Sequence, residues 1–158
     1  MAERPNMVYS VSHTTRDPRS GEADGVDYYF IGKQSFKGMA ADGEFAEWAE
    51  VFGRYYGTSK AEIARHLDAG RDVLLIVDVQ GAAQLLPKYP EAVSVFLVAP
   101  DDQELERRLR GRGSETEENI RRRLDKVAEE MQFGPQCKHI VVNDEVERAV
   151  KEILTFFG

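Results

Sequence analysis

The sequence predicts an α/β fold in which a parallel sheet lies between layers of helices, and two observations carry this prediction. Four short runs rich in β-branched residues are apolar almost without interruption, as is typical of strands that are buried on both faces. Segments whose apolar residues follow helical spacing lie between these runs. The expected strands lie near Val8–Ser12, Val73–Val79, Val93–Ala99 and Ile140–Asn143.

Capping signals indicate where several of the helices begin and end. Ser59 followed by Glu62 forms a capping box, and Gly70 stands where that helix should stop. Ser114 with Glu117 is expected to cap another helix. Apolar residues at helical spacing mark further helices around Leu105–Leu109, Ile120–Met131 and Val146–Phe157.

The segment from Asp17 to about Thr58 interrupts this rhythm and is expected to form a small β-rich lobe. Its stretch "EFAEWAEVFGRYYGT" alternates as antiparallel strands do. A short helix should precede it, with Ser35 as its cap and Gly43 as its stop. We expect Trp48 and Phe52 to pack in the core of this lobe.

Composition excludes several classes of protein. The 158 residues are 42% hydrophobic, which fits a globular domain, and no apolar run approaches the ~20 residues that span a bilayer. The single cysteine, Cys137, excludes an internal disulfide and a multi-cysteine metal site. A net charge of -7 argues against general nucleic-acid binding. We therefore expect a cytoplasmic protein that binds a small anion and neither nucleic acid nor membrane.

The loop Ser12–Glu22 is the first candidate site, because it follows the carboxyl end of the first expected strand. Arg16 and Arg19 can bind one phosphate together, and the Ser12 hydroxyl can add a donor. The competing interpretation is a solvated polar turn.

The lobe adds carboxylates and hydroxyls in an otherwise apolar and aromatic segment: Glu22, Tyr28, Glu47, Tyr56 and Thr58. A carboxylate accepts hydrogen bonds from the N1–H and N2–H₂ edge of guanine, which adenine cannot offer. A tyrosine hydroxyl can donate to phosphate and a threonine hydroxyl to guanine O6. Arginines beside such carboxylates suggest a guanine mononucleotide, although Glu47 could instead face solvent from its strand.

Seven arginines crowd the segment "LERRLRGRGSETEENIRRRL", which predicts a basic helical hairpin. Some of them form a solvated face, but arginines on a mobile lid are worth ~10³–10⁵ in the rate of phosphoryl transfer. Asp78, at the end of a strand, is placed to hold Mg²⁺ or its water shell. A strand-end cap is the competing interpretation of Asp78.

Together these motifs resemble the guanylate kinases, which are ATP:GMP phosphotransferases, over essentially the whole chain. The specific parts are "SVSHTTRDPRSGEADGVDYYF", "FAEWAEVFGRYYGTS", "VDVQGA", "RRLRGRGSETEENIRRRL" and "IVVND". The resemblance implies that GMP phosphate is bound by Ser12, Arg16, Arg19 and Tyr28, with Tyr56 nearby. It implies that Glu47 and Thr58 contact guanine, that Asn143 lies near adenine, and that Arg108, Arg112 and Arg123 are lid arginines bridging the nucleotides. Arg16, these lid arginines and Asp78 are the expected catalytic side chains, and ATP with Mg²⁺ the expected cofactors.

The resemblance also implies a fold, namely the three-layer parallel sheet of the P-loop nucleotide kinases. One domain over 1–158 would comprise a core (1–16, 59–106 and 132–158), a GMP-binding lobe (17–58) and a lid (107–131). The family's phosphate loop, G-x-x-x-x-G-K-S/T, occurs nowhere in the 158 residues. The chain thus looks like a guanylate kinase without its first strand and P-loop.

We therefore expect GMP binding without useful ATP turnover, since losing a 10³-fold contribution corresponds to ~4 kcal/mol of transition-state stabilisation. Ile76 stands where the family often has an acidic residue, which affects a magnesium or ribose contact. Loss of a central strand predicts a re-paired sheet or a strand-swapped homodimer. The alternative function is a non-catalytic guanylate-kinase-like module that binds phosphopeptides or partner proteins.

Overall fold

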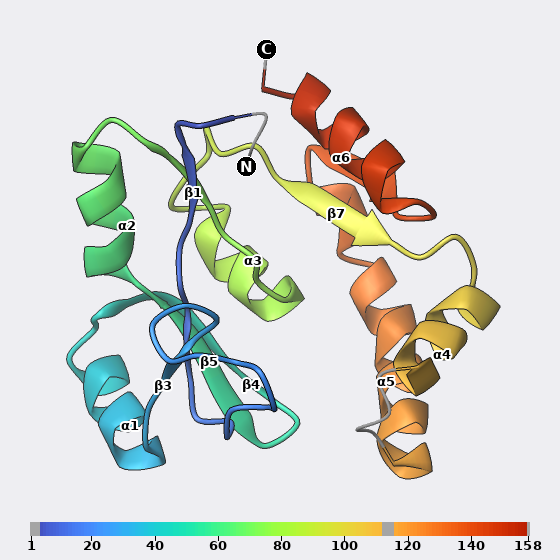
Figure 1. Ribbon diagram of the computed structural model, residues 1–158, viewed down its shortest axis with the longest axis horizontal. Coiled ribbons are helices and arrows are strands. Elements are labelled where there is room, and N and C mark those ends of the chain that lie inside the picture. Colours follow the sequence, from blue (N-terminus) through green and yellow to red (C-terminus); the bar gives the residue numbers. More distant parts are fainter. Residues whose placement is uncertain (1–3, 112–115, 158) are drawn as a thin grey trace. The chain divides into compact units, whose positions relative to one another are not determined.

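The computed structural model describes residues 4–111 and 116–157, and these fall into two compact units. Unit 1 ends at Pro90 and unit 2 begins at Glu91 (Figure 1). The division differs from the core, lobe and lid expected from the sequence, and those boundaries stay a prediction. Each unit is described below by itself.

Both units contain a pair of parallel strands, as the apolar runs predict. In unit 1, β1 (Met7–Tyr9) pairs with β6 (Asp72–Leu74), and in unit 2, β7 (Val95–Val98) pairs with β8 (His139–Val142). Each pair forms a two-stranded sheet. A mixed α/β fold is therefore confirmed, whereas the wider three-layer sheet remains a prediction.

Two of the expected strands are shorter than predicted. The run near Val8–Ser12 ends its pairing at Tyr9, and a separate strand, β2 (His13–Thr14), follows. The run Val73–Val79 pairs only as far as Leu74. The first strand is shorter because the chain leaves β6 after Tyr9 and joins the sheet of the lobe.

The lobe is a four-stranded sheet in the order β3-β2-β5-β4, which therefore begins before Asp17. It contains β3 (Tyr29–Phe30), β4 (Phe45–Val51) and β5 (Arg54–Ser59) besides β2. β4 and β5 are antiparallel, as predicted. Phe52 and Gly53 join them with φ values of 50° and 75°, the backbone of a type I′ turn.

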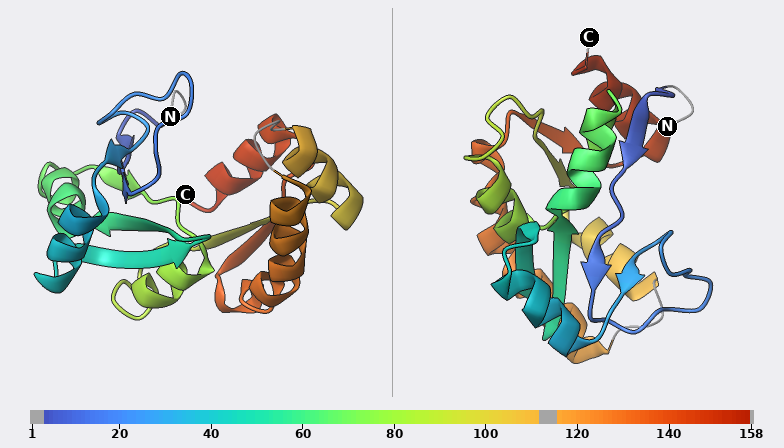
Figure 2. Two further views of the ribbon diagram at one scale, coloured as in Figure 1. Left: turned by 90° about the horizontal axis from the view of Figure 1, so that it is seen from below. Right: turned by 90° about the vertical axis from the view of Figure 1, so that its left-hand side faces the viewer.

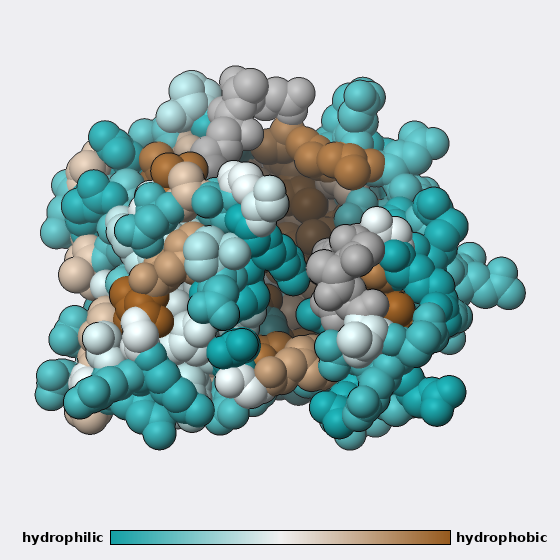
Figure 3. All heavy atoms as spheres, turned by 60° about the horizontal axis from the view of Figure 1, so that its bottom comes forward, coloured by the Kyte–Doolittle hydropathy of each residue, from teal (hydrophilic) through white to brown (hydrophobic). Residues whose placement is uncertain are grey.

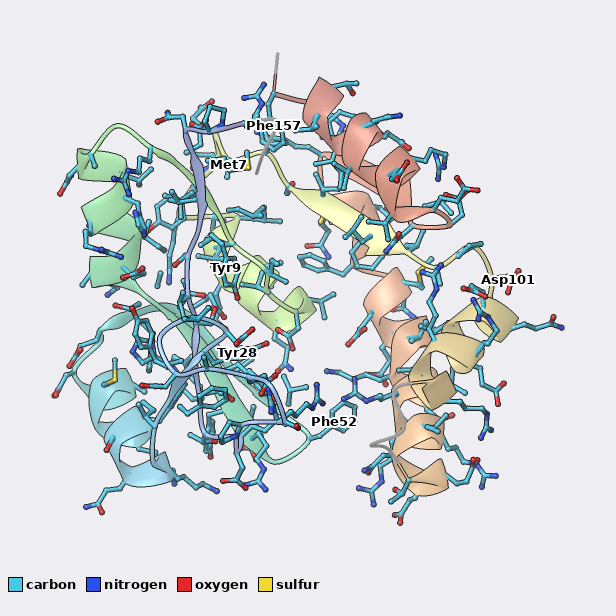
Figure 4. All side chains as sticks on the ribbon, viewed as in Figure 1. Met7, Tyr9, Tyr28, Phe52, Asp101 and Phe157 are labelled. Atoms are coloured by element: carbon cyan, nitrogen blue, oxygen red, sulfur yellow. The ribbon has the colours of Figure 1, made fainter. Side chains whose placement is uncertain are left out.

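Trp48 and Phe52 are not core residues, so that prediction is wrong. Trp48 is 41% exposed and Phe52 is 45% exposed. Trp48 lies on the face of β4 that packs at the edge of Phe36, and Phe52 projects from the hairpin turn (Figure 4). Among the described residues of unit 1 the buried cluster is formed instead by Ala46, Ile63 and Leu85, with Leu75 and Val77 against it.

The first two helices test the predicted caps. α1 (Lys33–Ala41) begins two residues before Ser35, with Gly32 as its N-cap, so the predicted cap is wrong. Gly43, at φ 68°, follows its C-cap as expected. α2 (Lys60–Asp68) begins at the predicted capping box, where Ser59 Oγ accepts from the Glu62 N–H.

The remaining helices are α3 (Val79–Leu85), α4 (Asp102–Gly111), α5 (Glu117–Met131), the 3₁₀ turn η1 (Gly134–Gln136) and α6 (Val146–Thr155). The sequence did not predict α3. Thr116, rather than Ser114, caps α5, since Thr116 Oγ1 accepts from the Asn119 N–H, and Ser114 lies outside the described residues. Within the described ranges, no helix is long and apolar enough to span a membrane. Figure 3 shows mainly hydrophilic side chains on the surface facing the viewer, which fits the high charge content.

Candidate functional site

The loop after β2 forms a cationic cluster organised by Glu22. Arg16 Nη2 donates to Glu22 Oε1 at 2.8 Å, and the Arg19 backbone N–H donates to Glu22 Oε2 at 2.7 Å. These hydrogen bonds lower the pKa of Glu22, and the same contact raises the pKa of Arg16. One carboxylate therefore fixes the direction of the Arg16 guanidinium and closes the turn that carries Arg19.

Two tyrosines complete this cluster. The rings of Tyr28 and Tyr56 lie 6.0 Å apart, and the Arg16 guanidinium lies 5.5 Å from the Tyr28 ring. Burial raises the pKa of Tyr28, so its hydroxyl remains a hydrogen-bond donor at neutral pH. Arg16 also interacts with the Tyr56 hydroxyl. Two cations and two hydroxyls in one place are suited to a phosphate group.

Glu47 lies in a second cluster on the same sheet. It is only 5% exposed, and the Thr58 hydroxyl donates to Glu47 Oε1 at 2.5 Å. Ser12 Oγ lies 3.5 Å from Thr58 Oγ1. Burial raises the pKa of Glu47, and the Thr58 hydrogen bond opposes that effect. The interpretation of Glu47 as a solvent-facing strand residue is therefore wrong.

A β-bulge gives Glu47 its direction. The register of β4 with β5 shifts between Phe45 and Glu47. Phe45 stacks on Phe36 of α1, with ring centroids 4.5 Å apart, whereas Glu47 bonds Thr58 and lies against Gly81 of α3. In a regular strand two such residues would share a face, but a bulge separates them. Phe45 can thus remain in the aromatic core while Glu47 turns toward α3.

Strand β5 links the two clusters. Tyr56 and Thr58 are two residues apart in a strand, so they share a face at a separation of about 7 Å. Tyr56 belongs to the cationic cluster, and Thr58 holds the buried carboxylate. β5 therefore presents groups suited to an anion and to a hydrogen-bonding base from one surface.

Asp78 is the N-cap of α3. Its Oδ1 accepts from the Gly81 N–H at 2.9 Å, and its Oδ2 accepts from the Gln80 side chain at 3.2 Å. Asp78 also contributes to the raised pKa of Glu47. Asp78 thus caps α3 and also lies close enough to Glu47 to affect its pKa. Ile76, two residues before Asp78, is exposed.

Unit 2 brings Arg108 and Asn143 together. Arg108 Nη1 donates to the Asn143 carbonyl at 2.7 Å, Nη2 donates to the Asp144 carbonyl at 3.1 Å, and Nε donates to Glu104 Oε1 at 2.6 Å. Arg108 therefore ties α4 to the loop after β8. Arg123 is half-buried in α5, and Arg112 lies outside the described residues.

Comparisons with known proteins show the family of this chain. A family model described as guanylate kinase matches residues 2–158. The chain belongs to the guanylate kinase family. A guanylate kinase from Thiobacillus denitrificans is 45% identical over 150 residues, covering 95% of this chain and 72% of that protein. One from Trichormus variabilis is 42% identical over 159 residues, covering 100% and 80%.

A solved structure leads to the same family. The crystal structure of guanylate kinase from Anaplasma phagocytophilum has a TM-score of 0.82 and 34% sequence identity. That match covers 96% of this chain and 74% of the other. Guanylate kinases are phosphotransferases, so the family supports an enzyme rather than a non-catalytic module.

The residues that the structure describes do not fit a dedicated magnesium cage. Among residues 4–111 and 116–157, no group of three or more His, Cys, Asp or Glu side chains could hold a metal ion. The hydrogen bonds from Gln80 and Gly81 engage both carboxylate oxygens of Asp78 within α3. The Asp78–Mg²⁺ contact therefore stays a prediction.

Sequence reasoning missed four residues around the two clusters. The Tyr9 hydroxyl is hydrogen-bonded to Ser12 and interacts with Tyr28. Gly81, Gln84 and Lys88 all contact β4 or Glu47 from α3 or the turn after it. A tyrosine within an apolar run gives no signal of such a contact. The spacing of 81 and 84 on one helix face would have been a signal had α3 been predicted.

Proposed function

We propose that unit 1 binds GMP, with the guanine base against Glu47 and Thr58. The observation that carries this proposal is the buried Glu47 carboxylate, held by Thr58 on the strand that also bears Tyr56. An ionised carboxylate accepts from guanine N1–H and N2–H₂, and the Thr58 hydroxyl can turn to donate to O6. Adenine offers the opposite pattern of donors at these positions, so the same pocket disfavours AMP.

The phosphate of GMP would bind at the cationic cluster. Arg16 and Arg19 supply charge, and the Tyr28, Tyr56 and Ser12 hydroxyls supply donors. Glu22 supports this assignment, because its hydrogen bonds hold the Arg16 guanidinium and the Arg19 backbone in place. It is proposed to act by positioning the arginines, since a carboxylate does not itself bind phosphate.

The reaction of the family is transfer of the terminal phosphoryl group of ATP to the GMP phosphate. Arg108, Arg112 and Arg123 are proposed to neutralise the charge that develops on the transferred group, and Asn143 to lie near adenine. The 158 residues contain no G-x-x-x-x-G-K-S/T motif, which would supply backbone N–H groups and a lysine to the ATP phosphates. We propose that these 158 residues, taken by themselves, bind GMP well and transfer phosphate poorly.

Isothermal titration calorimetry of the full chain tests the binding proposal. GMP should bind, AMP should bind at least about tenfold more weakly, and Glu47→Gln should remove most of the difference. Glu50→Gln is the matched control, because Glu50 is an exposed carboxylate on the same strand. Equal binding of GMP and AMP by the unaltered chain would refute the proposal.

A coupled assay for ADP release tests the proposal on turnover. With GMP and ATP at saturating concentrations, the chain should turn over at least about 10³-fold more slowly than a guanylate kinase that has the phosphate loop. A rate close to that of the complete enzyme would overturn this part while leaving GMP binding intact.

Three further expectations accompany the proposal, on the sheet, the cellular location and the oligomeric state. The two parallel strand pairs would belong to one three-layer sheet of the P-loop kinase type, and the protein would act in the cytoplasm. A homodimer or a strand-swapped oligomer would pair the strand edges of β6 or β7, since each of these strands has one hydrogen-bonded neighbour in the described residues. Light scattering after size-exclusion chromatography tests the oligomer, and a monomer would exclude it.

A further inference from the structure

Helix α3 contacts strand β4 at the two residues that flank Glu47. The Gln84 side-chain amide donates from Nε2 to the Trp48 carbonyl at 2.7 Å and accepts from the Trp48 N–H at 3.3 Å. Lys88, in the turn after α3, donates from Nζ to the Ala46 carbonyl at 2.6 Å. The backbone before and after Glu47 is therefore bound to α3 by side-chain hydrogen bonds. α3 packs along β4 as these bonds require (Figure 2).

Gly81, one helical turn before Gln84 in α3, lies against the Glu47 carboxyl group. A Cβ atom at position 81 would lie 2.5 Å from Glu47 Oε2, 3.1 Å from Glu47 Cδ and 3.1 Å from Val77 Cβ. Real Cβ atoms do not approach other atoms to 2.5 Å. Gly81 does not have a positive φ, so its backbone conformation is open to any residue. Position 81 therefore requires glycine for its small size and not for its backbone freedom.

The Glu47 carboxylate cannot move away from an added methyl group at low cost. It is buried, Thr58 holds its Oε1 at 2.5 Å, and Gln84 and Lys88 fix the backbone on either side. A displaced carboxylate would also move relative to Thr58 Oγ1, the other proposed contact to the base. One methyl group at position 81 would thus alter the alignment of the whole base-binding pair.

We propose that Gly81 is a specificity-determining residue for guanine, which positions the Glu47 carboxylate by leaving room for it, and that Gln84 supports the same alignment from α3. This inference rests on the proposed function, because it assumes that Glu47 contacts the base. It assigns the discrimination between purines to the fit between α3 and β4 as well as to the residues that touch the base.

The test compares GMP with IMP, which lacks the exocyclic 2-amino group that Glu47 would accept from. Affinities of the full chain and of Gly81→Ala are measured by calorimetry. The unaltered chain should prefer GMP, and Gly81→Ala should lower GMP affinity by roughly tenfold or more with a smaller effect on IMP. The ratio of the two affinities is the decisive readout, because a general loss of structure would weaken both ligands alike.

Gly38→Ala is the matched control. Gly38 lies within α1, and a Cβ there would meet nothing within 4 Å. It should leave both affinities unchanged. Trp48 is the only tryptophan, so its emission reports directly whether β4 has moved in each variant.

Two further variants extend the test, and the first of them, Gln84→Leu, keeps it decisive if Gly81→Ala folds poorly. Gln84→Leu removes both hydrogen bonds to Trp48 and should lower the GMP-to-IMP ratio in the same direction, by a smaller factor. Glu47→Asp withdraws the carboxylate by one methylene, so it should cost less in the Gly81→Ala background than in the unaltered chain. Additive effects of the two substitutions would overturn the inference.

The outcomes separate the inference from the proposed function. If the unaltered chain does not prefer GMP to IMP, the proposed contact of Glu47 with guanine fails. If it does prefer GMP and Gly81→Ala retains the full preference, only the role of Gly81 fails.

Discussion

Arg16 and Glu22 form an ion pair of 2.8 Å within the loop that carries the proposed phosphate site. Both side chains are largely shielded from solvent, and the other carboxylate oxygen of Glu22 binds the Arg19 backbone. Contacts within the loop therefore hold the Arg16 guanidinium and the Arg19 backbone in a defined arrangement. A phosphate would find this arrangement already formed, which reduces the ordering cost of binding.

Glu22→Gln should weaken GMP binding because it loosens Arg16. We expect a loss of about fivefold, corresponding to about 1 kcal/mol for one less ordered side chain. Guanosine, which lacks the phosphate, should bind as before in calorimetry. Glu118→Gln, which breaks the exposed Glu118–Arg122 pair, is the matched control. Tighter GMP binding by Glu22→Gln would show that Glu22 repels the phosphate more than it orders the loop.

The affinity for GMP should rise with pH as Glu47 ionises. Burial raises the pKa of Glu47 above its ordinary value of 4.5, and the carboxylate rather than the acid accepts from guanine. Titrations between about pH 5 and about pH 8 should show that the affinity for GMP rises at a pH above the range in which an ordinary glutamate ionises. Glu47→Gln should bind weakly and show a smaller rise, limited to the second ionisation of the GMP phosphate at about pH 6. An unaltered chain whose affinity is flat over this range would contradict the prediction.

The same raised pKa has the opposite effect on stability. The folded state binds the Glu47 proton more tightly than the unfolded state, so the free energy of unfolding falls as pH rises from 4.5 through the folded-state pKa. Chemical denaturation of the unaltered chain and of Glu47→Gln at several pH values measures this. The difference between the two should shift in favour of Glu47→Gln as pH rises, and a constant difference would refute it.

Thr58→Val should destabilise unit 1 at neutral pH. The substitution leaves the buried Glu47 carboxylate without the hydroxyl that donates to it, at a cost of about 1–3 kcal/mol. Urea denaturation followed by Trp48 fluorescence measures the change. Thr155→Val is the control, since its hydroxyl donates to the Glu152 carbonyl at an exposed helix end. Equal effects of the two substitutions would contradict the prediction.

Arg108→Ala should destabilise unit 2 by about 1–2 kcal/mol, because its guanidinium holds two backbone carbonyls after β8. GMP binding by unit 1 should not change. Arg107→Ala removes only an exposed pair with Glu104 and should cost less than about 0.5 kcal/mol. If Arg108→Ala behaves like Arg107→Ala in thermal unfolding, the contacts with the loop contribute nothing measurable.

The elements that the sequence predicted best are those whose signals are local. The Ser59–Glu62 cap and the β4–β5 hairpin depend on residues close together in the chain, and both are confirmed. The β-bulge beside Phe45 and the contact of Gly81 with Glu47 depend on packing between distant segments, which periodicity does not show. α3 was missed because its first residue continues an apolar run and a glycine stands in its middle.

The site shows the same division. Residue types alone grouped Arg16 with Arg19, and they left two interpretations of Glu47 open, a contact with guanine and a solvent-facing strand position. The structure decides in favour of burial for Glu47 and adds the ion pair between Arg16 and Glu22. The exposure of Trp48 could not be predicted, since an aromatic residue in an alternating strand can face either side.

The turn between β4 and β5 offers a route to a more stable protein. Phe52 adopts a left-handed backbone that costs an ordinary L-residue about 1 kcal/mol, whereas asparagine before glycine accepts it readily. Phe52→Asn would relieve this strain at the exposed tip of the hairpin, in a turn that contributes none of the hydrogen bonds of Glu47 and Thr58. Such a substitution could offset the destabilising variants above, so that their binding properties can be measured in a folded chain.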